Sequence, residues 1–162
     1  MKVVVNSTPL IHLSAMGRLD LLKMLFREIL IPEEVYEEVV LLGGERAGSV
    51  EVRKADWIHQ SQVQNRAVLQ ALQVTLGAGE AACIALASSI SADLVILDDR
   101  LARLHALSLE LKITGTVGFL LRCAERGVLN FEATLHDLLA TSFRLSPREA
   151  KRIIELWVQQ RQ

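Results

Sequence analysis

The sequence predicts an α/β protein in which a central, mainly parallel β-sheet lies between two layers of helices. Two observations lead to this three-layer fold. Short apolar runs and helical segments alternate along the chain, in the order β-α-α-β-α, a helical middle, then β-α-β-α-α-α. The clearest apolar runs are continuous, as in parallel strands that are covered on both faces. We expect one domain over residues 1–162, in which residues 142–162 form a C-terminal helical extension.

The first half of the chain contains two predicted strands, each followed by helix. The first helix can be capped by Ser7 or Thr8, with Pro9 in its first turn. After the second strand comes a helix that opens at Pro32 and places Val35, Val39 and Leu42 on one face. The predicted elements of this half are strands over 2–6 and 27–31 and helices over 7–17, 19–25 and 32–42.

The second half begins with a loop over residues 43–49, which hold three glycines. Its best strand signal is residues 92–99, an apolar run that ends in two aspartates. The last helix is capped by Ser146, with Pro147 at its first position. The other predicted elements are a possible edge strand over 57–63, a short strand over 112–116, and helices over 66–76, 77–90, 100–111, 116–127, 130–142 and 146–160.

The composition fits a folded domain. The 162 residues are 51% hydrophobic and only 4% aromatic, so the core must be built from Leu, Val, Ile and Ala. Charged residues make up 23% and the net charge is -1, which excludes a disordered or a polybasic chain. Any contact with phosphate must therefore come from a local basic patch.

The cysteines and the N-terminus indicate the cellular compartment. Cys83 and Cys123 lie in alanine- and leucine-rich helical contexts, which favours two buried free thiols over a disulfide. Because cysteine is sparse and the N-terminus lacks the layout of a signal peptide, we expect a cytoplasmic protein. No apolar run has the length needed to cross a bilayer, so no membrane partner is expected.

Polar residues follow the predicted strands, at the edge of the sheet where α/β proteins bind ligands. Asn6 follows the first strand, and two aspartates follow the strand over 92–99. Glu80 starts a helix behind two glycines, where a carboxylate interacts well with the helix dipole. Hard oxygen donors without a Cys or His cluster suit Mg²⁺ or Mn²⁺. The full set of candidate oxygen donors is Asn6, Glu37, Glu38, Glu80, Asp98 and Asp99.

The same residues also have ordinary structural roles. Acids on helices, such as Glu37 and Glu38, are usually solvated, and Glu80 can act on the helix dipole alone. Asp98 or Asp99 can cap the helix that begins after them. From the residues alone, a metal site and these structural roles both remain open.

Basic residues that can contact phosphate lie close to the acids. Arg100 and Arg103 follow the two aspartates directly. The tail over residues 143–162 carries a local excess of basic residues that could guide RNA, namely Arg144, Arg148, Lys151, Arg152 and Arg161. His12, His59 and His136 show no ligand spacing, so we interpret them as incidental.

Four segments of the sequence together resemble PIN-like proteins. VVVNSTPLIHLSAMGRLDLL is similar to the family's first motif, an apolar strand followed by Asp-x-Ser-Pro-Leu-Ile. ILIPEEVYEEV resembles the second motif, a strand, a proline and a helix with an acidic residue. LGAGEAACIALA is similar to the third, Gly-x-Gly-Glu followed by small residues. ADLVILDDRLARLHALSLELKITGTVGFLL resembles the fourth, including the Arg, the short strand and the Gly-Thr turn. The ordered combination is specific, although each motif alone is weak.

This resemblance implies a PIN-like fold with the activity of a divalent-metal-dependent ribonuclease that prefers single strands. Its implied partners are RNA, a second copy of the chain and a small antitoxin, because related proteins are toxins of type II toxin–antitoxin pairs. The family's acids fall on Asn6, Glu38, Glu80 and Asp99, and its hydroxyl position falls on Thr8. The candidate catalytic residues are Asn6, Glu38, Glu80, Asp98 and Asp99, and all of these except Asp98 are candidate metal ligands. Glu37 is the alternative to Glu38. The candidate substrate-binding residues are Thr8, Arg100 and Arg103.

Asn6 departs from the family's pattern, which has an aspartate at this position. An amide keeps a carbonyl oxygen for a cation but lacks the negative charge, and metal affinity depends on ligand charge. Two functions therefore remain open: an active ribonuclease, acting as a toxin, or a protein of weak or no activity that binds RNA or a partner. An unrelated phosphatase or nucleotide-binding domain is disfavoured, because GAGE lacks the lysine or third glycine of a phosphate-binding loop.

Overall fold

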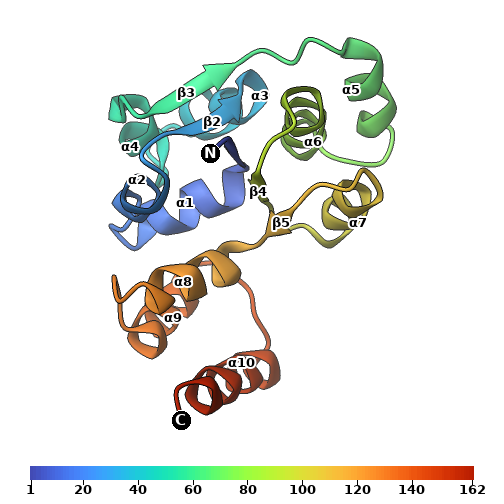
Figure 1. Cartoon of the computed structure of the whole chain (residues 1–162). Helices are drawn as coiled ribbons and strands as arrows, with labels where there is room; N and C mark the ends of the chain where they lie inside the picture. The colour runs from blue at the N-terminus through green and yellow to red at the C-terminus, as the bar shows by residue number, and fades with distance from the viewer.

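A computed structural model describes all 162 residues and shows a five-stranded, all-parallel sheet surrounded by ten α-helices (Figure 1). The predicted α/β class is therefore confirmed. The strands are β1 (Val3–Val5), β2 (Ile29–Pro32), β3 (Ile58–Ser61), β4 (Leu94–Ile96) and β5 (Ile113–Thr114). The helices are α1 (Ser7–Ala15), α2 (Asp20–Phe26), α3 (Glu33–Tyr36), the π-helix η1 (Glu37–Leu41), α4 (Ser49–Lys54), α5 (Arg66–Gln73), α6 (Ala78–Ile90), α7 (Arg100–Ser108), α8 (Thr116–Glu125), α9 (Phe131–Leu139) and α10 (Pro147–Gln160).

The strand order β3-β2-β1-β4-β5 creates a switch point in the middle of the sheet. The chain first runs outward from β1 to β2 and β3, then returns through α5 and α6 to β4 on the other side of β1. Val5 of β1 lies opposite Ile96 of β4, so both strands end at the same level. In open parallel sheets, ligands bind beyond the carboxyl ends of the strands at such a point.

Helices cover both faces of the sheet. Figure 1 shows α1 and α2 on one side and α6 and α7 on the other. Helix α6 packs against β1, β2 and β4, because the small residues Ala81, Ala82 and Ala85 on its buried face allow close approach. Strands β1 and β4 are fully buried between these layers, which explains their continuous apolar sequence.

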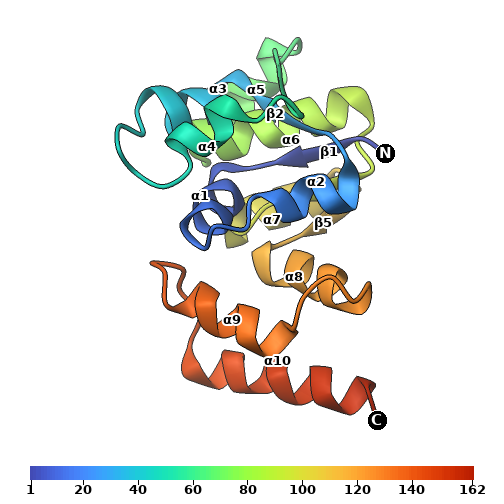
Figure 2. The same ribbon diagram turned by 90° about the vertical axis from the view of Figure 1, so that its left-hand side faces the viewer.

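The C-terminal helices lie beyond β5, at the opposite end of the molecule from β3 (Figures 1 and 2). Helix α10 begins as predicted, with the Ser146 side chain accepting a hydrogen bond from the backbone of Glu149 and Pro147 in its first turn. It lies beside α9, where Trp157 packs on Phe131 with ring centroids 5.4 Å apart. No helix combines the length and the apolar character that a membrane span would require.

Two local predictions were wrong. The N-cap of α1 is Asn6, not Ser7 or Thr8, and its side chain makes no capping hydrogen bond. The helix predicted over 32–42 changes at Glu37 into a π-helix, closed by a bond from Leu42 N to Glu37 O. Leu42 consequently turns outward and is 68% exposed, whereas Val35 and Val39 are buried as predicted.

Candidate functional site

Asn6 and Asp98 lie together at the switch point, beyond the carboxyl ends of β1 and β4. The backbone N–H of Asn6 donates to the carbonyl of Ile96 at 3.0 Å, so β1 remains paired up to the start of α1. Asn6 is 2% exposed and therefore belongs to the floor of the site. The sequence prediction of polar residues at this edge of the sheet agrees with this placement.

Three side-chain oxygens converge on Gly79 of α6. The hydroxyl of Ser7 donates to Glu38 Oε2 at 2.8 Å. A Cβ atom at Gly79 would lie 2.9 Å from Glu38 Oε2, 3.3 Å from Asn6 Oδ1 and 3.6 Å from Ser7 Oγ. Glycine at position 79 leaves room for these oxygens, and a larger residue would displace at least the Glu38 carboxylate. Ser7, which the sequence offered only as a helix cap, is a member of this group.

The π-helix places Glu38, and not Glu37, toward α1. A π-helix has an i→i+5 bond and more residues per turn than an α-helix, and such segments occur frequently at functional sites. Both side chains are exposed, but Glu38 accepts the Ser7 bond and lies beside Gly79, whereas Glu37 has no side-chain hydrogen bond. The geometry thus favours Glu38 among the two acids that the sequence left open.

Asp98 is held by α8 rather than directed freely into the site. Its Oδ1 accepts the backbone N–H of Thr116 at 2.8 Å and its Oδ2 accepts the Thr116 hydroxyl at 2.5 Å. Thr116 is completely buried, and a Cβ at Gly115 would lie 2.7 Å from Asp98 Oδ1. Asp98 therefore links the end of β4 to the start of α8, and both of its oxygens are engaged.

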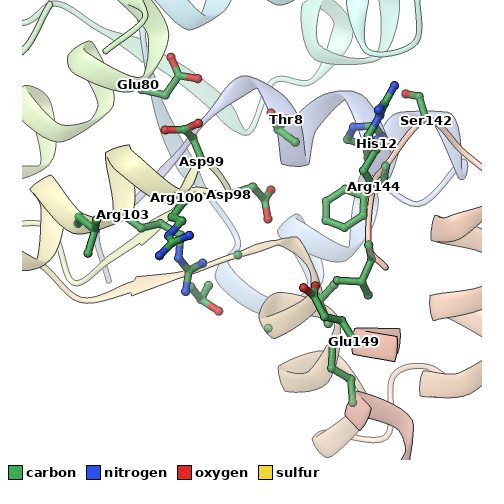
Figure 3. A pocket seen from close by; sticks show the side chains of 18 of the residues that line it. Thr8, His12, Glu80, Asp98, Asp99, Arg100, Arg103, Ser142, Arg144 and Glu149 are labelled. Atoms are coloured by element: carbon green, nitrogen blue, oxygen red, sulfur yellow. The ribbon is translucent and has the colours of Figure 1, made fainter. Parts of the chain in front are cut away.

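Asp99 and Glu80 stand on the other side of the site. Asp99 caps α7, because its Oδ2 accepts the backbone N–H of Ala102 at 2.9 Å, which matches the expectation that one of the two aspartates is a cap. Glu80 lies in the first turn of α6 and is partly exposed. Figure 3 shows the two carboxylates pointing toward one another at one end of a pocket.

This pocket has a volume of about 890 Å³ and joins the acidic end of the site to the C-terminal segment. Arg100, Arg103 and Thr8, the predicted substrate-binding residues, are among those that line it. Asn6 and Glu38 are not among the lining residues, and of the two only Asn6 is buried, whereas Glu38 is exposed. Arg144, one of the basic residues of the C-terminal tail, also lines the pocket, together with residues that the sequence did not indicate, among them His12, Ser142, Phe143 and Glu149.

His12 is fixed in the wall of the pocket and is 9% exposed. Its Nδ1 lies 3.3 Å from Thr141 Oγ1, and its ring meets Phe143 edge to face, with centroids 5.2 Å apart. Burial lowers the pKa of His12 below its ordinary value of 6.5, and the Asp98 carboxylate offsets this only in part. The imidazole is therefore neutral at pH 7.

Cys83 lies beneath the acids and is completely buried. Its Sγ is 3.7 Å from Asn6 Oδ1 and 3.8 Å from the carbonyl of Val5. Burial raises the pKa of this thiol well above 9.0, and the charges of Glu80, Glu34 and Glu38 raise it further. Cys83 is thus a protonated donor toward Asn6 and not a nucleophile. Cys123 is also free and buried, so both cysteines are as predicted.

The donor set fits a hard divalent cation by its chemistry. The oxygens of Asn6, Glu38, Glu80 and Asp99 are the ligand type that Mg²⁺ and Mn²⁺ prefer. They stand in two groups, one around Gly79 and one formed by Glu80 and Asp99, and no three His, Cys, Asp or Glu side chains are gathered closely enough to hold an ion. Asp98 fits less well, because Thr116 occupies both of its oxygens.

Comparison with known proteins identifies the family. No curated protein matches the chain. The DUF3368 family model, described as a PIN domain, matches residues 2–159. The parallel sheet of the structure agrees with this match. Since the match extends over almost the whole chain, we conclude that the protein belongs to the PIN domain family, whose members are generally metal-dependent nucleases.

Proposed function

We propose that the protein is an Mg²⁺- or Mn²⁺-dependent endoribonuclease that hydrolyses phosphodiester bonds in RNA. The main support is the position of the oxygen donors at the switch point of the sheet, in the same region as a pocket lined by arginines. Carboxylates without a cation would repel the phosphate backbone, whereas carboxylates with bound Mg²⁺ or Mn²⁺ attract it.

The residues of the chain have separable roles in this proposal. Asn6, Glu38, Glu80 and Asp99 would hold the cation, which supplies activation of water and neutralisation of charge on the attacked phosphate. Ser7 fixes Glu38 through its 2.8 Å hydrogen bond, and the capping bond of Asp99 fixes that carboxylate at the start of α7. The water oxygen would bond to phosphorus while the bond to the leaving ribose oxygen breaks and that oxygen takes up a proton.

The arginines would bind the substrate. Arg100 and Arg103 line the pocket beside Asp99 and carry positive charge toward a ligand with one phosphate per nucleotide. Arg103 is positioned by its Nη1, which donates to the carbonyl of Leu97 at 3.1 Å. Thr8 lines the same pocket and offers a hydroxyl to the substrate.

A cleavage assay tests the proposal. End-labelled single-stranded RNA is incubated with the protein and Mg²⁺ or Mn²⁺, and with EDTA as the metal-free arm. The double variant Glu80→Gln/Asp99→Asn should lower the rate by about 100-fold or more, the scale of losing contacts made to the transition state. The matched control Glu132→Gln/Asp137→Asn changes two exposed acids of α9 and should cleave like the unaltered protein. Cleavage that survives the first double substitution would locate the activity elsewhere.

We further propose that the protein acts as the toxin of a toxin–antitoxin pair. As a toxin, the protein would act in the cytoplasm as a homodimer and be neutralised by a small antitoxin protein that covers the site. Induced expression should then arrest growth, and Glu80→Gln/Asp99→Asn should relieve the arrest. Normal growth during expression of a protein that cleaves RNA in vitro would separate the toxin role from the nuclease.

A specific observation favours a second candidate function, a PIN domain protein of weak or no activity that binds RNA or a partner. Asn6 lacks the charge of an aspartate, its oxygen already lies near the Cys83 thiol, and the carboxylates are not gathered into one group. Absence of cleavage with every divalent ion tried, together with retained RNA binding, would support this function over the first.

A further inference from the structure

The pocket has a second end that the proposed chemistry does not use. Opposite Glu80 and Asp99, it is walled by His12 of α1 and by Phe143 and Arg144, which belong to the segment between α9 and α10 (Figure 3). Phe143 and Arg144 also line an adjoining cleft of about 790 Å³. The C-terminal segment thus adds the aromatic Phe143 and the basic Arg144 to the pocket, and Glu149 of α10 also lines both cavities.

Thr141 sets the protonation of the imidazole at this end. Its hydroxyl donates to the carbonyl of Leu138 at 2.5 Å and accepts the backbone N–H of Phe143 at 3.1 Å. With the hydroxyl donating to Leu138, the 3.3 Å contact of Thr141 Oγ1 with His12 Nδ1 favours the tautomer that carries its proton on Nδ1. In the neutral ring, Nε2 then carries no proton, and it has no hydrogen-bond partner within the chain.

An unprotonated imidazole nitrogen distinguishes ligands by whether they offer it a hydrogen-bond donor. It repels the oxygens of a phosphate, which are also acceptors, and it accepts from N–H groups such as those on the edges of nucleobases. Beside it, the half-buried ring of Phe143 offers an aromatic surface of the kind on which unpaired bases stack. The exposed Arg144 supplies positive charge for the adjoining phosphate.

The size of the pocket is compatible with such a ligand. A volume of about 890 Å³ lies within the range of pockets that enclose small organic ligands, about 300–1,000 Å³. A nucleotide whose phosphate lies near Arg100 and Arg103 can therefore place an adjacent base toward Phe143 within the same cavity.

We propose that His12, Phe143 and Arg144 form a subsite for one unpaired nucleobase of RNA, with Phe143 as the stacking surface and His12 as the hydrogen-bond acceptor. The subsite gives the protein a base preference at one position of its ligand. Its role in choosing a cleavage position rests on the proposed ribonuclease function, whereas base binding itself does not.

Fluorescence anisotropy with the full-length protein tests the subsite when Ca²⁺, which binds the same type of oxygen ligand, replaces Mg²⁺ and a gel verifies that the probes stay intact. The probes are labelled hexamers of adenylate, cytidylate and uridylate and a hexamer of the same backbone without bases. The unaltered protein should bind its preferred hexamer about 10-fold or more tightly than the abasic one, because stacking on an aromatic side chain is lost. Equal affinity for the two, or no binding of any probe, would overturn the proposal.

Three variants separate the contributions. Phe143→Leu keeps an apolar side chain and should bring the preferred hexamer close to the abasic one. His12→Ala should reduce the ratio between the highest and the lowest Kd of the three hexamers by about 5-fold, which is the scale of one hydrogen bond. The control His136→Ala changes an exposed histidine of α9 and should keep this spread of Kd. Arg144→Ala should weaken all probes alike, unlike Arg148→Ala, which lies outside the pocket. A spread that His12→Ala leaves unchanged would overturn the role of His12.

The two proposals can fail independently. The variant Glu80→Gln/Asp99→Asn should keep the same base preference in the anisotropy assay, because its substitutions lie at the acidic end of the pocket. Metal-dependent cleavage by a protein without base preference would contradict the subsite alone. A base preference without cleavage under any divalent ion would contradict the nuclease and leave the subsite supported.

Discussion

Asn6 satisfies the fold but lacks the negative charge that a metal site would use. Its backbone continues β1 and starts α1, which any polar residue could do, while its side chain faces Ser7, Glu38 and Cys83. An asparagine avoids a further negative charge beside Glu38, because two neighbouring carboxylates without a cation repel one another. We therefore expect the neutral Asn6 to bind a metal ion less tightly than an aspartate at this position would.

Asn6→Asp should therefore strengthen binding of Mn²⁺ or Mg²⁺ by about 10-fold or more, since one negative charge is added at the site. Isothermal calorimetry measures the change. Without metal, the same variant should melt at a lower temperature, and saturating Mn²⁺ should reverse this difference. Asn130→Asp at the N-cap of α9 adds an equal charge far from the site and is the control. Unchanged affinity in Asn6→Asp would place Asn6 outside the metal site.

Gly79→Ala tests the convergence of oxygens around α6. The added Cβ would lie 2.9 Å from Glu38 Oε2, so Glu38 must move away from Ser7. Alanine is favoured over glycine inside a helix by about 1 kcal/mol, which offsets part of the loss in stability. We expect a folded protein whose Mn²⁺ affinity falls, measured by calorimetry together with thermal unfolding. The exposed neighbour Ala78→Ser should bind Mn²⁺ normally, and normal binding by Gly79→Ala would contradict the role of this group.

His12 predicts how stability depends on pH. Because burial lowers its pKa, the unfolded chain binds a proton at about pH 6.5 while the folded protein resists protonation until a lower pH. The free energy of unfolding should thus be highest above pH 6.5 and decrease as the pH falls toward the pKa of the folded state. Urea unfolding between about pH 7.5 and about pH 5.5 measures this slope. His12→Gln should reduce the slope, and the exposed His136→Gln should not.

At the scale of elements, the π-helix shows what local sequence could not predict. A period of 3.6 residues correctly placed Val35 and Val39 in the core, but it also placed Leu42 there, where the structure has an exposed side chain. The segment η1 packs against α1 and α4, which the periodicity of its own residues does not show. The register of Glu37 and Glu38 therefore could not be resolved from the sequence.

This register predicts opposite outcomes for two neighbouring acids. Glu38→Gln removes a charge from the group around Gly79 and should reduce Mn²⁺ affinity and RNA cleavage together. Glu37→Gln removes the same charge from a side chain that makes no hydrogen bond to this group and should leave both nearly unchanged. Calorimetry and the cleavage assay on this matched pair provide the measurement, and a larger effect from Glu37→Gln would reverse the assignment.

At the scale of the whole molecule, the order of elements in the sequence predicted the parallel sheet and the residues at its edge. Asn6, Asp98 and Asp99 were predictable because a polar residue directly after a buried strand must lie at that edge. The end of the pocket that contains His12, Phe143 and Arg144 was not predictable. It arises because α10 lies beside α9 through Trp157 and Phe131, and no spacing along the chain indicates where a terminal helix will dock.

The central claim is that the two groups of oxygens at the switch point bind one or more divalent ions. A crystal structure of the protein soaked in Mn²⁺, with the ions located by anomalous scattering, tests this claim most directly. We predict an anomalous peak within coordination distance of Glu80 and Asp99 oxygens, with Glu38 and Asn6 oxygens drawn toward it. Separated carboxylates without a peak between them at saturating Mn²⁺, or a peak only elsewhere on the molecule, would contradict the account.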